Sequence, residues 1–128
     1  MRTSITAAIV AGILAICVGA ALAQTAPAKT ADTAKGKALV DAKGMTLYIF
    51  DRDATGKSNC DGACATKWPP LKAAADAKPS GDWTVVTRDD GGKQWAYKGK
   101  PLYLFAKDTR PGDVTGDGVN SVWHIAAP

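Results

Sequence analysis

Two cysteines, Cys60 and Cys64, could carry chemistry in this sequence, alone or together with His124, the single histidine. They could form a disulfide, act as a redox pair, or bind zinc or copper with His124. Three residues separate the two cysteines, whereas thioredoxin-like redox motifs and c-type haem attachment sites have two. Gly62 lets the intervening loop turn tightly enough for the thiols to meet. We therefore predict a structural disulfide and no cofactor, with a Cys60/Cys64/His124 metal site as the alternative.

Carboxylates are the second candidate for chemistry, because the acidic residues of the 128-residue chain are all aspartates. Asp53 and Asp108 follow similar aromatic segments, and paired carboxylates can act as acid and base when one pKa is raised. Turn-forming aspartates more commonly accept hydrogen bonds from backbone N–H groups of the following loop, and we predict that role. The sequence contains one histidine and no G-x-S-x-G motif. We therefore expect a protein that is not an enzyme.

A glycine-rich segment, residues 112–120, has part of the pattern of a calcium-binding loop. Asp113, Thr115 and Asp117 have the appropriate relative positions, but His124 stands where such a loop has glutamate. A glycine-rich turn is the favoured interpretation of this segment.

The chain repeats itself at an offset of 55 residues, as from Gly44 to Gly99 and from Trp68 to Trp123. The pattern Gly-x-x-Leu-Tyr-x-Phe-x-x-Asp occurs twice, and a tryptophan follows each occurrence at the same distance. Composition alone would give roughly one or two identities between two such windows, so the chain contains an internal duplication. The repeat motif consists of Gly44, Leu47, Tyr48, Phe50, Asp53 and Trp68 in the first copy and of Gly99, Leu102, Tyr103, Phe105, Asp108 and Trp123 in the second.

Each copy is predicted to form short β-strands, because the chain lacks glutamate and contains 13 glycines and seven prolines. A hairpin turn is expected at residues 89–92 and a helical turn after Pro70, within residues 67–78. The predicted fold is all-β: a small single domain of about eight short strands with little helix, built from two repeats related by a pseudo-twofold axis. Alternation and turn residues place strands at 37–41, 45–51, 83–88, 93–97, 101–107 and 121–125.

The first 23 residues have the pattern of a secretory signal peptide, with Arg2 before an apolar run that ends in Ala-Leu-Ala. An uncleaved membrane anchor and lipid attachment at Cys17 are alternatives. Lipid anchoring is not expected, because Ile16 stands where a lipobox has a small residue. We expect a periplasmic or secreted bacterial protein without a transmembrane segment after cleavage.

The mature chain is expected to begin with a flexible linker, residues 24–35, which contains no large apolar side chain. Residues 36–128 are predicted to form the single β domain. Within it we place repeat one at 36–73, a connecting strand region at 74–90 and repeat two at 91–128.

These motifs together resemble a family of bacterial secreted repeats and predicted lipoproteins with a Yx(F/W/Y)xxD motif. The resemblance covers about residues 36 to 126 and depends on the agreement of both copies in order and spacing. It implies an exported, β-rich repeat domain of a family whose function is described as unknown. The segments that carry it are Leu47–Asp53, Cys60–Cys64 and Trp68–Leu71, followed by Tyr103–Asp108, Pro111–Gly112 and Trp123–His124.

Three functions remain open. We favour an exported, non-enzymatic domain that binds a partner or an envelope component, with Trp83, Trp95 and Tyr97 as candidates for an exposed aromatic platform. A periplasmic redox or metal-handling accessory that uses Cys60, Cys64 and His124 is the alternative, and a small hydrolase ranks last. The formal net charge is +4, but aspartates lie between the lysines, so no nucleic-acid partner is expected.

Overall fold

The computed structural model describes residues 26–128. The predicted signal peptide, Cys17 and the first two residues of the predicted linker lie outside this part of the chain. None of the helices within it has the length and apolarity needed to cross a membrane.

The fold is all-β with little helix, as predicted, although residues 26–128 form seven strands rather than about eight. One short helix and one 3-10 turn accompany them: α2 (Ala63–Lys67) and η1 (Val119–Ser121). The strands are β1 (Lys29–Thr33), β2 (Gly36–Val40), β3 (Tyr48–Phe50), β4 (Trp83–Thr87), β5 (Lys93–Tyr97), β6 (Lys100–Pro101) and β7 (Trp123–Ile125).

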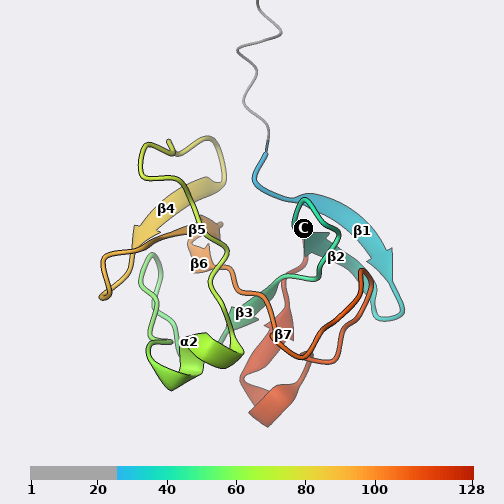
Figure 1. Ribbon diagram of the computed structural model, residues 1–128. Coiled ribbons are helices and arrows are strands. Elements are labelled where there is room, and N and C mark those ends of the chain that lie inside the picture. Colours follow the sequence, from blue (N-terminus) through green and yellow to red (C-terminus); the bar gives the residue numbers. More distant parts are fainter. Residues whose placement is uncertain (1–25) are drawn as a thin grey trace, which may run out of the picture.

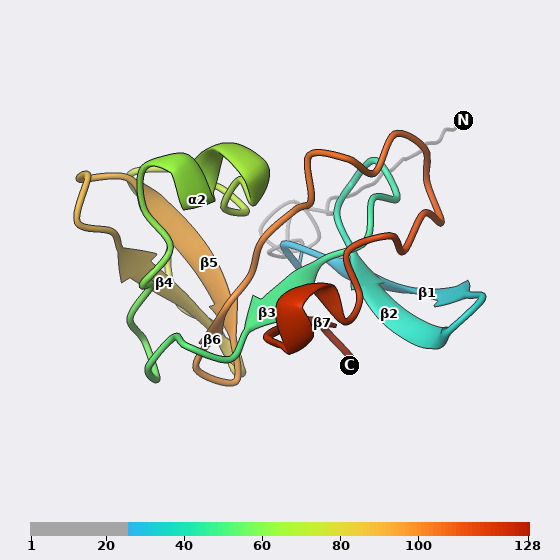
Figure 2. The ribbon, with the colours of Figure 1, turned by 90° about the horizontal axis from the view of Figure 1, so that it is seen from below.

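The strands form three small antiparallel sheets. The β1–β2 hairpin lies on one side of the molecule and the β4–β5–β6 sheet on the other, with the β3–β7 pair between them (Figure 1). In this central pair, Tyr48 faces Ile125 and Phe50 faces Trp123 across the strands. The two copies of the repeat are therefore joined by strand pairing at the centre of the fold, where Figure 2 shows β3 and β7 between the two hairpins.

A pseudo-twofold relation is visible in the backbone hydrogen bonds. Tyr48 N–H donates to the carbonyl of Tyr103 at 2.8 Å, and Tyr103 N–H donates to the carbonyl of Tyr48 at 3.0 Å. Further along the strands, Asp51 N–H donates to the carbonyl of Val122. The equivalent residues, Ala106 and Lys67, each in the other copy, make the same bond, from Ala106 N–H to the carbonyl of Lys67. Each copy thus supplies the same backbone groups to the other.

The two copies differ by one residue ahead of the motif. In the second copy, Lys98 and Gly99 form a two-residue hairpin turn with φ angles of 52° and 84°, and Ala96 pairs with Pro101. In the first copy, Val40 pairs with Thr46, so the connection is one residue longer. The repeat is strictly in register only from the glycine of the motif onward.

The predicted flexible linker, residues 24–35, is wrong over Lys29–Thr33, which form β1. The absence of large apolar side chains did not prevent a strand, because β1 is held by backbone pairing to β2 along its whole length. The lack of large apolar side chains was therefore a poor guide to where the domain begins, because the domain begins before residue 36.

The helical turn predicted after Pro70 is also wrong, since α2 (Ala63–Lys67) ends before Pro69. Two consecutive prolines lack backbone N–H donors and restrict the residue that precedes them, so they follow the helix rather than begin it.

Candidate functional site

A column of four aromatic rings crosses the centre of the molecule. The rings of Trp68 and Trp123 stack at 3.8 Å between centroids, with 4° between their planes. Phe105 stacks on the other face of Trp68 at 4.0 Å, and Phe50 stacks on Trp123 at 4.2 Å. Each tryptophan thus contacts the phenylalanine of the other copy, and both tryptophans are buried.

Each motif tyrosine also contacts the aspartate of the other copy. The Tyr48 hydroxyl donates to Asp108 Oδ2 at 2.5 Å, and the Tyr103 hydroxyl donates to Asp53 Oδ2 at 2.7 Å. Burial and the neighbouring carboxylates raise the pKa of both tyrosines far above the ordinary value. The motif spacing therefore serves a reciprocal exchange of side chains between the copies.

The second oxygen of each aspartate holds the loop that follows it. Asp53 Oδ1 accepts a bond from Asn59 N–H at 2.7 Å, and Asp108 Oδ1 accepts one from Thr115 N–H at 3.1 Å. Burial raises the pKa of Asp53, against the opposing effect of the Asn59 and Tyr103 donors and the Arg88 charge. Both oxygens of each aspartate thus accept hydrogen bonds that hold the fold together, as predicted for turn-forming aspartates. The two carboxylates lie in equivalent surroundings, so the structure does not distinguish one as an acid and the other as a base.

The tryptophan pair is part of the lining of an open hollow of about 520 Å³, a volume within the range of small-molecule sites. Arg52 and Lys67, both exposed, are the charged residues of its lining, so the rim is cationic. We call this feature the aromatic hollow. It is lined by Phe50, Arg52, Ala63, Cys64, Lys67, Trp68, Asn120, Val122 and Trp123.

Cys60 and Cys64 form a disulfide, as predicted, with 5.2 Å between their Cα atoms. The bond joins the loop before α2 to the first turn of that helix, which is one wall of the aromatic hollow. Cys60 is fully buried against the aromatic column. The disulfide therefore anchors Cys64, one of the residues that line the hollow.

Arg88, which the sequence reasoning did not select, holds the same loop from the β4–β5 side. Its side chain is only 1% exposed. Nη1 donates to Ser58 Oγ at 2.9 Å and to Gln94 Oε1 at 2.8 Å, and Nη2 donates to the carbonyl of Cys60 at 2.6 Å. Gln94 is buried beside it, two residues before buried Ala96 on β5, and no local pattern in the sequence marks this polar interior.

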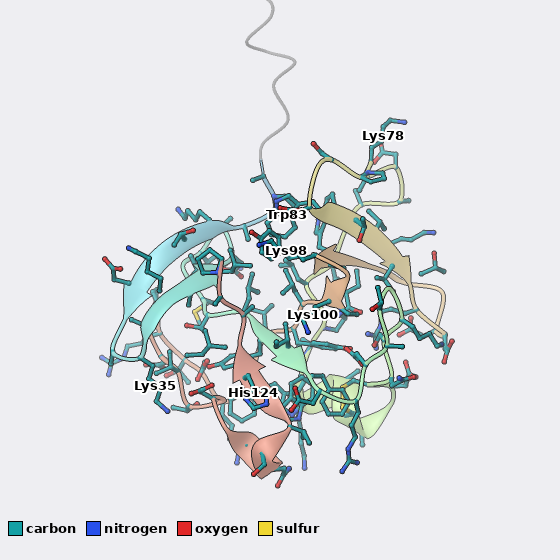
Figure 3. The ribbon with its side chains drawn as sticks, turned by 180° about the vertical axis from the view of Figure 1, so that it is seen from behind. Lys35, Lys78, Trp83, Lys98, Lys100 and His124 are labelled. Carbon is teal, nitrogen blue, oxygen red and sulfur yellow. A yellow bond between two sulfur atoms is a disulfide. The ribbon has the colours of Figure 1, made fainter. Side chains whose placement is uncertain are left out.

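The alternative metal site is not formed. Cys60 and Cys64 are joined to each other, and His124 Nε2 lies 2.7 Å from Asp51 Oδ2. The His124 side chain, on β7 (Figure 3), is 41% exposed. Among residues 26–128, no group of three His, Cys, Asp or Glu side chains is arranged to hold a metal ion.

The aspartates of the glycine-rich segment hold their own loop. Asp113 Oδ2 accepts bonds from the backbone of Thr109 and Arg110, and Asp117 Oδ1 accepts one from Ile125 N–H. These backbone donors lower the pKa of Asp113. The segment is a glycine-rich turn, as the sequence favoured.

Trp83, Trp95 and Tyr97, the candidates for an exposed aromatic platform, are half-buried and pack against the aliphatic core. Trp83 lies 4.8 Å from the Tyr97 ring and 6.3 Å from the Trp95 ring, and all three border the cluster around Leu47. Figure 3 shows Trp83 beside Lys98, at the end of the β4–β5 hairpin.

A family model described as a secreted repeat of unknown function matches the chain twice, at residues 29–72 and 84–127. The matched segments begin with β1 and β4, ahead of the predicted repeat boundaries at 36 and 91. No similar curated protein was found, and no similar solved structure was found.

Proposed function

This chain belongs to the family of secreted repeats of unknown function, and from that premise we propose that it is an exported, non-enzymatic binding domain whose ligand lies in the aromatic hollow. The observation that carries the proposal is the position of the hollow across both repeats. Trp68 comes from the first copy and Trp123 from the second. A binding surface made by the duplication itself explains why the two copies remain in one chain.

The hollow suits a ligand with an anionic, acceptor-rich group. Its two charged side chains are Arg52 and Lys67, which carry positive charge and only donate hydrogen bonds. Potentials at an interface are commonly complementary. We therefore assign the partner as an anionic component of the bacterial envelope or its surroundings.

Site-directed photocrosslinking in cells that export the protein tests this function. A photoreactive residue replaces Asn120, on the rim of the hollow, and in a matched strain it replaces exposed Asp76, away from it. We expect an adduct from position 120 that disappears when Arg52 and Lys67 are both changed to glutamate. Equal adducts at positions 120 and 76, or none at position 120, would contradict the proposal.

A further inference from the structure

A second cavity, of about 370 Å³, lies between residues 70–73 and the turn of the β4–β5 hairpin. It is separate from the aromatic hollow and shares none of its lining residues. Lys72, Lys93 and Arg88 line it, together with the single acid Asp90. The cavity therefore carries an excess of positive charge.

Arg88, a lining residue of this cavity, has one N–H group without a hydrogen-bond partner within residues 26–128. Both Nη atoms are bonded to the first loop and to Gln94, but Nε has no hydrogen-bond partner among the described residues. The nearest carboxylate oxygen, Asp90 Oδ2, lies at 3.6 Å, beyond hydrogen-bond distance. Because the guanidinium is almost fully buried, an unbonded N–H on it is costly.

The acids near Arg88 compensate its charge poorly. Asp61 and Asp90 approach it at 3.4 and 3.6 Å, and their side chains are 42% and 62% exposed. A buried cation is stabilised by a close, desolvated anion, and neither aspartate provides one. The cavity that Arg88 helps to line has room for such an anion, and Lys72 and Lys93 would attract it.

We propose that this cavity is an oxyanion-binding site, which takes a phosphate or carboxylate group on the Arg88 Nε–H with Lys72 and Lys93 at its sides. Asp90 stands beside the same N–H and competes with the ligand for it. The equivalent hairpin of the first copy, β1–β2, has Thr33 at its turn and no arginine. The site is thus a property of the second hairpin alone.

Nuclear magnetic resonance of the arginine side chains tests the proposal directly on the folded, disulfide-bonded protein. The Arg88 Nε–Hε resonance is followed while inorganic phosphate, and in a second series acetate, replaces chloride at constant ionic strength. We expect a saturable shift of this resonance, and the series in which it occurs identifies the oxyanion. The absence of a saturable shift in both series would overturn the proposal.

Matched variants separate a built site from general attraction to a basic protein. Lys72→Gln and Lys93→Gln should each weaken phosphate binding about threefold, and Asp90→Asn should strengthen it by a similar factor. Lys43→Gln removes the same charge from an exposed turn outside the cavity and should leave the affinity unchanged. Equal weakening by Lys43→Gln would reduce the effect to net charge and overturn the site.

Discussion

The first loop, residues 54–67, and the second loop, residues 109–122, occupy equivalent places in the two copies and are held by different means. The first contains the disulfide and is bonded to buried Arg88. The second contains neither, and Val119 packs on the aromatic column as Cys64 does in the first loop. The paired repeat motifs therefore support one loop that is held by a covalent bond and one that is held by non-covalent contacts alone.

The second loop depends on hydrogen bonds and close packing. Thr115 donates to Asp108 through both its backbone and its hydroxyl, and Gly116 N–H donates to the Tyr48 hydroxyl at 3.2 Å. A Cβ on Gly116 would lie 2.9 Å from the rings of Trp68 and Tyr48. The backbone of Gly116 therefore packs directly against the aromatic column, where a side chain would not fit.

The comparison separates the constant part of the repeat from the part that is free to vary. Tyrosines, aspartates and tryptophans of both copies exchange partners across the pseudo-twofold axis, so changing one of them affects both halves. The two loops contact this frame through different residues, and both contribute side chains to the lining of the aromatic hollow. The part of the lining that differs between the copies therefore comes mainly from the two loops.

The largest expected effect comes from Arg88→Met, which removes the clamp on the first loop and keeps most of the apolar stem. The buried acceptors Ser58 Oγ, Gln94 Oε1 and the Cys60 carbonyl would lose their donor. We expect the free energy of unfolding to fall by about 3–5 kcal/mol, as measured by urea denaturation.

Arg110→Met is the matched control, because Arg110 is an exposed arginine of the second loop. Its effect should stay within about 0.5 kcal/mol. A loss of stability from Arg88→Met that is no larger than this would show that the first loop does not depend on the buried cation.

A smaller effect is expected from the double variant Cys60→Ser, Cys64→Ser. The disulfide closes a loop of only five residues, counting both cysteines, and the chain-entropy relation gives about 2 kcal/mol for this length. The variant should still fold, because Arg88 and Asp53 continue to hold the loop, but its unfolding midpoint should lie at a lower urea concentration.

Thiol titration of the wild-type protein under denaturing, non-reducing conditions supplies the control. We expect no free cysteine in exported protein. Two free thiols with bound metal would instead favour the metal-handling alternative, and complete unfolding of the double variant would mean that the loop has no second support.

The repeat motif predicted which residues are equivalent, because identical spacing in one chain requires identical backbone positions. The sequence also predicted the β-structure and, from the two cysteines, the disulfide, whereas the β3–β7 pairing of the two copies is a finding of the structure. The exchange of Tyr48 with Asp108 and of Tyr103 with Asp53 was not predictable, since spacing within one copy does not say which copy supplies the partner.

The positions of the functional candidates outside the repeat motif could not be predicted from the sequence. Arg88 follows β4, where a charged residue ordinarily faces solvent, and its burial depends on contacts with a loop 27 to 30 residues earlier. The aromatic hollow likewise combines Arg52 and Lys67 with Asn120. No local pattern places these residues together, because they meet only after the copies have paired.

The smallest effect tests the second loop. Gly116→Ala adds one methyl group where the tryptophan and tyrosine rings leave no space, and overpacking of this kind costs about 1–2 kcal/mol. Gly112→Ala is the control, since Gly112 has a φ of +90° but nothing within 4 Å of its would-be Cβ, so it measures the cost of backbone strain alone. Near-ultraviolet circular dichroism distinguishes the two variants, because only the change at Gly116 should alter the tryptophan signal of the stacked pair. If Gly116→Ala left both stability and this signal unchanged, close packing would not be what holds the second loop, and its aspartate hydrogen bonds alone would stand in for the disulfide and arginine of the first.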